Sequence, residues 1–263
     1  MSEPQIRFED GAAYEQMMGI WSRIAGDVFL DWLAAPAGLR WVDVGCGNGA
    51  LTELVVERCM PSEIHGVDPA PGQLAFARTR PGARIAQFHE GDAMALPFAD
   101  NRFDVATMAL AIFFVPQPEK GVAEMARTVK PGGIVSSYTW DMPGGGFPIE
   151  SFRTQMRAMG LKPFGPPHEE ASRMDVLGEL WAGAGLENIE TKEIIANRTF
   201  TEFEEFWRIT LAGSSSVGPM VAKMPPGEQE RLKKGVRALL PAAADGSITI
   251  AGRANAIKGR VRK

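Results

Sequence analysis

The stretch WVDVGCGNGAL, residues 41–51, decides the fold of this 263-residue chain. Bulky apolar residues alternate with smaller or acidic ones over its first four positions, and Gly45, Gly47 and Gly49 then occupy every second position. Alternation predicts a strand, whereas glycine permits the positive φ angles of a tight turn and a close approach of a ligand to the backbone. We therefore expect a strand, a sharp bend and a helix that begins near Ala50.

The spacing of the bend is compatible with more than one ligand. Gly45, Gly47 and Ala50 satisfy the dinucleotide fingerprint G-x-G-x-x-G/A. The helix that follows offers unpaired N–H groups and the positive end of its dipole, so an anionic group should bind there. In NAD that group is the pyrophosphate, and the bend alone does not separate NAD from other anionic ligands.

Strands and helices alternate around this bend. Alternating or buried apolar runs predict strands, and three- and four-residue apolar spacing predicts helices of about ten residues. Such alternation implies βαβ units, right-handed crossovers and a buried parallel sheet. The expected strands are 40–45, 63–68, 84–92, 102–112 and 133–140, and the expected helices are 50–60, 71–80 and 118–129, the last ended by the KPGG turn at 130–133.

The remainder of the chain has a different pattern. Apolar spacing predicts helices over 14–33, and a Gly- and Pro-rich loop follows residue 140. Thr201 with Glu204 three residues on forms a capping box for one later helix. The expected later helices are 151–160, 174–185, 201–216 and 227–240, and the expected strands are 186–200 and 246–260, the last returning to the sheet edge beside 186–200.

Composition limits the class of protein. The chain is 45% hydrophobic and 23% charged with a net charge of −4, which is ordinary for a globular protein and gives no electrostatic footprint for nucleic acid. Cys46 and Cys59 have no metal-ligand or redox spacing, so we expect no metal site. The longest apolar run, 106–115, is shorter than the about 20 residues of a membrane span. We expect a cytoplasmic monomer or homodimer without a signal sequence or membrane span.

Acidic residues follow three of the expected strands. Asp43 lies two residues before Gly45, Asp68 ends the strand 63–68, and Asp92 follows the third strand. A carboxylate at the end of the second strand is well placed to bind both hydroxyls of a ribose, which suits NAD and other adenosine cofactors equally. An acid at the third strand end can accept a hydrogen bond from the amine of adenine.

Four segments together resemble the class I S-adenosylmethionine-dependent methyltransferases, of the small-molecule type that includes the ubiquinone and menaquinone biosynthesis enzymes. They are VDVGCGNG, GVDPA, GDAMALPFADNRFDV and RTVKPGGIVSSYTW, in order over about residues 40–140. The resemblance implies an α/β fold with a Rossmann-like, seven-stranded, mostly parallel sheet, helices on both faces and an added helical cap. It implies N-terminal helices over the cofactor (1–38), a cofactor-binding core (39–143) and a C-terminal part (144–263) with cap segments at about 145–185 and 201–240.

The resemblance also implies a cofactor, S-adenosylmethionine, and residues that bind it. The glycine turn would lie against its methionine and ribose portions, with Asp43 near the amino group. Asp68 would bind the ribose hydroxyls and Asp92 the adenine amine, while Tyr14 and the helix 17–23 would close over the site. The implied set is Tyr14, Asp43, Gly45, Cys46, Gly47, Gly49, Asp68, Pro69, Gln73, Gly91, Asp92, Ala93, Ala109 and Leu110.

Methyl transfer from a sulfonium is an in-line displacement, so proximity and alignment supply much of the catalysis and a strong base is needed only for some acceptors. Asp141 and His168 are candidates for contacts to the acceptor, whereas His65 and His89 are expected to be structural. Residues 108–114, MALAIFF, lack the N/D/S-P-P-Y/F/W motif of nucleic-acid amino-methyltransferases. A small apolar or planar acceptor is expected beside four aromatic residues: Trp21, Phe113, Trp140 and Phe147.

Two alternatives stay open. An NAD-dependent oxidoreductase would share the glycine bend, although the chain has only two tyrosines, Tyr14 and Tyr138, and no Tyr-x-x-x-Lys pair. A module that binds S-adenosylmethionine without catalysis would share every cofactor residue.

Overall fold

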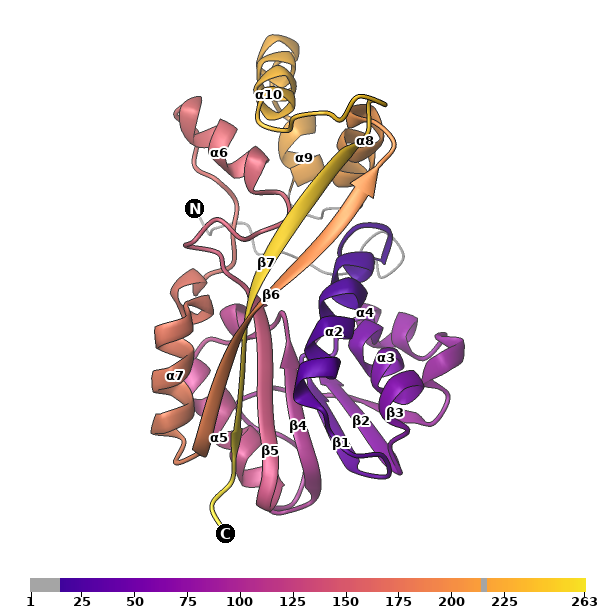
Figure 1. Ribbon diagram of the computed structural model, residues 1–263, viewed down its shortest axis with the longest axis vertical. Helices are drawn as coiled ribbons and strands as arrows, with labels where there is room; N and C mark the ends of the chain where they lie inside the picture. The colour runs from indigo at the N-terminus through magenta and orange to yellow at the C-terminus, as the bar shows by residue number, and fades with distance from the viewer. Residues whose placement is uncertain (1–14, 214–216) are drawn as a thin grey trace.

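One seven-stranded sheet organises the computed structural model, which describes residues 15–213 and 217–263 (Figure 1). The strand order is β3-β2-β1-β4-β5-β7-β6, and only β7 runs against its neighbours. The expected mostly parallel, Rossmann-like sheet is confirmed. The strands are β1 (Arg40–Val44), β2 (Glu63–Asp68), β3 (Ala86–Glu90), β4 (Phe103–Ala109), β5 (Val129–Trp140), β6 (Glu187–Phe200) and β7 (Ile248–Arg260).

The chain order creates a switch point beside β1. The chain runs outward from β1 to β2 and β3, and then returns to place β4 on the other side of β1. Connections that leave two neighbouring parallel strands in opposite directions open a crevice at the carboxyl ends of those strands, where ligands bind in such sheets. The glycine bend lies at this edge, because it follows β1 directly.

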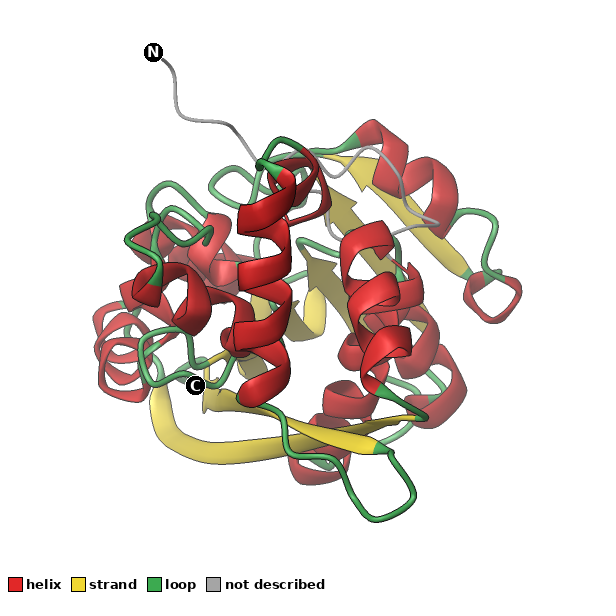
Figure 2. Cartoon of the chain, turned by 90° about the horizontal axis from the view of Figure 1, so that it is seen from above, coloured by secondary structure: helices red, strands yellow, loops and turns green. Residues whose placement is uncertain are grey.

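Helices cover both faces of the sheet, as seen from above in Figure 2. On one face, α2 (Ile20–Leu33) and α3 (Ala50–Cys59) pack on the sheet, in a hydrophobic cluster that includes Phe29 of α2 and Tyr138 of β5. On the other, α5 (Pro118–Thr128) and α7 (Met174–Gly183) pack with Val135. The other elements near the sheet are α4 (Pro71–Ala77) and the short helices η1 (Glu15–Gly19), η2 (Pro81–Ala83), η3 (Ile112–Phe114) and η4 (Glu169–Ser172).

The long strands β6 and β7 extend beyond the parallel strands and carry a helical cap (Figure 1). Its core is aromatic, since the ring of Phe152 stacks on Trp207 with centroids 5.0 Å apart. No helix among residues 15–213 and 217–263 is long and apolar enough to cross a membrane. The cap helices are α6 (Glu150–Ala158), α8 (Phe203–Gly213), α9 (Val217–Ala222) and α10 (Pro226–Ala238).

The expected cap segment 145–185 is wrong in its last part, because α7 lies along the sheet. Trp181 is fully buried there, and its indole Nε1–H donates to the carbonyl oxygen of Val135 on β5 at 3.0 Å. The final strand is also not at the edge. β7 lies between β5 and β6, since its residues 254–257 are buried in succession, whereas β6 is mostly exposed.

Three local expectations also differ from the structure. The helix expected over 71–80 ends at Ala77, since Pro81 favours extended backbone at the residue before it. The KPGG segment is part of β5, where the register against β4 shifts. The capping box uses Glu205, which accepts from the backbone N–H and the hydroxyl of Thr201 at 2.7 Å each.

Candidate functional site

A cavity of about 200 Å³ opens at the carboxyl ends of β1, β2 and β4, at the switch point of the sheet. Twelve of the fourteen residues implied for the cofactor line it, together with ten other residues. The lining residues are Ser22, Asp43, Gly45, Cys46, Gly47, Asn48, Ala50, Leu51, Val67, Asp68, Pro69, Ala70, Gln73, Gly91, Asp92, Ala93, Ala109, Leu110, Ala111, Phe114, Val115 and Pro116.

The glycine bend requires glycine at two of its positions for different reasons. Gly45 has φ +69°, and a Cβ there would stand 2.6 Å from Cβ of Ala111, so the loops after β1 and β4 could not approach one another. Gly47 has φ +51°, and a Cβ there would meet nothing within 4 Å. The first glycine permits close packing, whereas the second keeps the backbone open toward the cavity.

Gly49 does not line the cavity. Its φ is +78°, a Cβ there would lie 3.0 Å from Cβ of Ala77, and its N–H donates to the carbonyl oxygen of Cys46 at 2.9 Å. This glycine therefore shapes the turn and its packing on α4. Tyr14, the other implied residue that is missing from the wall, lies outside the described residues.

Asp68 joins the end of β2 to the bend. Its Oδ2 accepts the N–H of Gly47 at 2.8 Å, and its Oδ1 accepts the N–H of Ala70 at 2.9 Å. Burial raises the pKa of this carboxyl above its usual value, against the two backbone hydrogen bonds. Asp68 thus holds the turn in shape and presents a carboxylate to the cavity.

Asp43 is fully buried at the base of the cavity. Its Oδ2 accepts the hydroxyl of Thr52 at 2.6 Å, and its Oδ1 has no hydrogen-bond partner among the described residues. Burial, with a smaller contribution from the charge of Asp68, raises its pKa to about 7. Burial and the two carboxylates also raise the pKa of the Cys46 thiol well above its usual value, so the thiol stays neutral.

The loop after β3 forms another wall. Asp92 is exposed, and its Oδ1 accepts the N–H of Met94 at 2.8 Å. Gly91 packs against Val67, and its N–H donates to the carbonyl oxygen of Asp68 at 3.2 Å. The acids after β2 and β3 are therefore held beside one another at the cavity.

The loop after β4 supplies the largest part of the wall that sequence reasoning missed, namely Ala111, Phe114, Val115 and Pro116. Leu110 adopts φ +55°, and η3 then directs Phe114 and Pro116 toward the cavity. A signal was available for this loop, because the residues that follow β4 must lie at the same sheet edge as those that follow β1. Ser22 of α2 also lines the cavity, and it belongs to the segment 17–23 that was expected to close over the cofactor.

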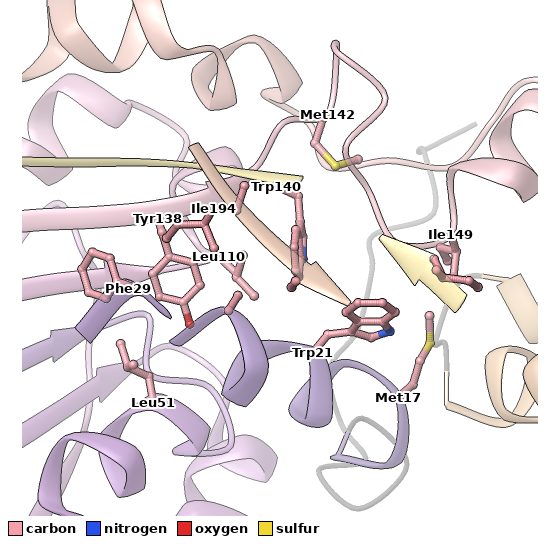
Figure 3. Close-up of a cluster of buried hydrophobic side chains, with 14 of the residues drawn as sticks. Met17, Trp21, Phe29, Leu51, Leu110, Tyr138, Trp140, Met142, Ile149 and Ile194 are labelled. Atoms are coloured by element: carbon pink, nitrogen blue, oxygen red, sulfur yellow. The ribbon is translucent and has the colours of Figure 1, made fainter. Parts of the chain in front are cut away.

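The four aromatic residues expected around an acceptor do not line this cavity. Trp21 and Trp140 pack edge to face with centroids 6.2 Å apart, within a buried cluster that includes Met17, Met142 and Ile149 (Figure 3). The rings of Phe113 and Phe114 pack with their centroids 4.8 Å apart, and those of Phe147 and Phe164 with their centroids 6.4 Å apart. Their apolar surfaces are used by packing between the sheet, α2 and the cap.

Asp141 and His168 lie outside the cavity wall as well. Asp141 pairs with Arg253 at 2.7 Å and caps its own loop by accepting the N–H of Gly144 at 3.0 Å. The backbone N–H of His168 donates to the carbonyl oxygen of Phe113 at 3.1 Å, in the loop that precedes η4. Asp141 thus has a structural role in its loop.

His65 and His89 form a hydrogen-bonded pair within the sheet. Their nitrogens Nδ1 and Nε2 lie 2.8 Å apart, and His65 Nε2 lies 2.7 Å from Oε1 of Glu63. Burial lowers the pKa of His89, and the ring of Phe98 covers both histidines. Neither histidine lines the cavity.

Replacing Tyr138 with Phe should destabilise the protein by about 1 kcal/mol, because the buried Tyr138 hydroxyl donates to the carbonyl oxygen of Ser22 at 3.1 Å. This bond fixes the part of α2 that lines the cavity. Urea unfolding of the variant and the natural protein measures the difference. An unchanged free energy of unfolding would show that the bond contributes nothing.

Comparison with known proteins finds a family match over a little more than a third of the chain. Residues 42–137 match the family described as "Methyltransferase domain". The chain is 40% identical over 114 residues to the demethylmenaquinone methyltransferase of Desulfitobacterium hafniense. The aligned segment covers 41% of this chain and 45% of that protein. The chain is 36% identical over 121 residues to the ubiquinone/menaquinone biosynthesis C-methyltransferase UbiE of Dinoroseobacter shibae, covering 44% and 48%.

The chain thus spans about half the length of the curated relatives it matches. Among solved structures, the YcgJ protein from Bacillus subtilis superposes with a TM-score of 0.59 at 19% identity, covering 91% of this chain and 98% of that one. At this identity the likeness concerns the fold.

Proposed function

We propose that the protein belongs to the methyltransferase-domain family that residues 42–137 match, and that it transfers a methyl group from S-adenosylmethionine to a small acceptor. The alternative that shares the glycine bend is an NAD-dependent oxidoreductase. The charge of the cavity is the observation that separates them.

The cavity wall suits a cationic ligand. Three carboxylates, those of Asp43, Asp68 and Asp92, line it, and no Lys, Arg or His does among the described residues. A pyrophosphate would bring two negative charges against these carboxylates with no basic side chain to offset them. S-adenosylmethionine carries a sulfonium and an ammonium against one carboxylate, so its net charge complements the wall.

The residues of the cavity fit such a cofactor in their hydrogen bonding too. Oδ1 of Asp43 and both amide atoms of Gln73 are buried without a hydrogen-bond partner in the part of the chain that the structure describes, and buried polar atoms are ordinarily paired. Asp43 would hold the ammonium group, Asp68 the ribose hydroxyls and Asp92 the adenine amine. The N-terminal residues of α3 and the bend would receive the carboxylate.

When bound, S-adenosylmethionine supplies a methyl group already activated by its sulfonium. The protein then has to exclude water and to align donor and acceptor, which can account for much of the rate. Ser22 and Leu110 close the wall between the sheet and α2. We assign no general base, since Asp141 and His168 lie outside the wall.

The acceptor we propose is small and apolar or planar. The names of the two relatives given above describe methyltransferases of quinone biosynthesis. The matched domain ends at residue 137, before the cap, and we therefore propose that residues outside the match select the acceptor of this chain. The apolar side chains of Leu110 and Phe114 in the cavity wall support an apolar surround for it.

Calorimetry with S-adenosylmethionine, S-adenosylhomocysteine and NADH tests the cofactor, followed by a panel of small acceptors with labelled methyl donor. We expect both adenosyl ligands to bind and NADH not to bind. Binding of NADH alone would contradict the proposal. Tight binding of the adenosyl ligands with no labelled product from apolar, planar or polar acceptors would instead favour a non-catalytic module.

A further inference from the structure

A buried arginine lies directly behind the glycine bend. Arg80 follows α4, and only 8% of it is exposed. Its Nε donates to the carbonyl oxygen of Asn48 at 2.5 Å, and its Nη1 donates to Oε2 of Glu53 on α3 at 2.8 Å. Its Nη2 donates to the carboxylate of Glu15. One guanidinium thus joins the bend, the helix after it and the N-terminal helix η1.

Glu15 and Asn48 close this arrangement into a ring of contacts. Oε2 of Glu15 accepts the side-chain amide of Asn48 at 2.8 Å as well as the guanidinium of Arg80. Asn48 is 1% exposed and lies between Gly47 and Gly49 of the bend, where it lines the cavity. Its backbone carbonyl and its side-chain amide are therefore held by Arg80 and Glu15, neither of which lines the cavity.

Local sequence positions Arg80 for this role. Pro81 disfavours helix at Arg80, whose φ of −67° and ψ of 121° turn the chain back toward α3. The N–H of Gly82 then donates to Oε1 of Glu53 at 3.0 Å, and a Cβ on Gly82 would lie 2.8 Å from Cγ of the same residue. The loop after α4 thus packs closely on Glu53.

The helix η1 reaches the cap as well as the bend. It packs against α8, and the carbonyl oxygen of Met17 accepts Nη1 of Arg198 on β6 at 3.3 Å. The contacts of Glu15 are therefore a route by which the state of the bend can affect the elements that carry the cap.

We propose that Arg80 is a positioning residue of the cofactor site, which holds the glycine bend in its binding form and, through Glu15, couples it to η1 and the cap. A planar guanidinium can serve three acceptors at once in fixed directions, which an ammonium on a flexible stem cannot. A buried charge also requires its partners, so removing one partner disturbs the others. This inference rests on the proposed cofactor, but its first test does not.

Hydrogen exchange of the ligand-free protein is the first test. Glu15→Ala should speed amide exchange in peptides that span residues 41–51, because Asn48 and Arg80 lose a shared acceptor. Glu119→Ala, an exposed glutamate of α5, is the matched control and should leave these peptides unchanged. Unchanged exchange of the bend in a folded Glu15→Ala variant would overturn the coupling, whether or not the proposed function holds.

Binding of S-adenosylhomocysteine is the second test, by a double-mutant cycle over Glu15→Ala and Arg80→Gln. Each single variant should bind about tenfold more weakly than the natural protein, and the double variant should bind more weakly than the natural protein by much less than a hundredfold. Arg84→Gln, four residues away and exposed, controls for the lost charge. Unchanged affinity in both single variants would overturn the proposal. So would a double variant whose loss of affinity equals the product of the two single losses.

Arg80→Lys keeps the positive charge, and it replaces Arg80→Gln in the binding test if Arg80→Gln does not fold. It should restore folding but only part of the affinity, since one ammonium cannot hold Asn48, Glu53 and Glu15 in the same directions. Full affinity in Arg80→Lys would show that charge alone matters and would contradict the positioning role. Natural protein that shows a protected bend but binds no adenosyl ligand would count against the proposed function alone.

Discussion

Asp43→Asn is expected to stabilise the ligand-free protein at pH 8 and to flatten its stability between pH 4 and pH 7. Asp43 is fully buried, and its pKa of about 7 exceeds the ordinary 3.8. The folded state therefore binds this proton more tightly than the unfolded state does. The stability that protonated Asp43 contributes is fully present below pH 4 and is lost as the pH rises to about 7. The free energy of unfolding changes by on the order of 4 kcal/mol over this range because of this group.

Asparagine is neutral at every pH, so it avoids burying a charge. Its amide also keeps an acceptor for the hydroxyl of Thr52, but it buries an N–H₂ group at a cost of about 1–3 kcal/mol. The net gain at pH 8 should therefore be roughly 1–3 kcal/mol. Urea unfolding from pH 4 to pH 8 measures it, and a steep fall in the stability of the variant with rising pH would contradict this assignment.

Asp104→Asn is the matched control with the opposite sign. Asp104 is also almost buried, but Lys130 and Arg40 hold its pKa below the usual value against the effect of burial. A lowered pKa gives stability that is present above about pH 4 and lost as the pH falls. Asp104→Asn should therefore destabilise the protein at neutral pH, where Asp43→Asn stabilises it.

Asp68→Ala should weaken binding of S-adenosylhomocysteine by about 1.5–3 kcal/mol, or roughly 10- to 150-fold. The carboxylate is the proposed partner of the ribose, and it also accepts the N–H groups of Gly47 and Ala70. Calorimetry on a folded variant measures the loss. Glu90→Ala, an exposed acid at the end of β3 outside the cavity wall, should bind as the natural protein does.

The two roles of Asp68 can be separated with a ligand that lacks the ribose hydroxyls. If the carboxylate binds them, natural protein should discriminate against a 2′,3′-dideoxy analogue and Asp68→Ala should discriminate much less. Equal discrimination by both proteins would restrict Asp68 to ordering the bend. An unchanged dissociation constant for the complete ligand would remove Asp68 from the site.

The acids of the site could be predicted because they depend on short-range pattern. Asp43, Asp68 and Asp92 each follow or end a strand, and parallel strands place their carboxyl ends at one edge. Gly49 was misplaced for the opposite reason, since spacing alone does not tell a glycine that faces a ligand from one that packs on Ala77. Trp21 and Trp140 were misplaced because aromatic composition does not distinguish a cavity wall from packed core.

The sequence by itself determined the alternating strands and helices and the positive-φ bend at residues 45–49, because φ preferences and side-chain periodicity act over a few residues. Only the tertiary structure decided that β7 lies between β5 and β6, that α7 covers the sheet, and that Arg80 meets Glu15 across 65 residues. These features depend on which surfaces bury one another, and that choice is made by the whole chain at once. The bend therefore has its form from its glycines and its support from distant charges.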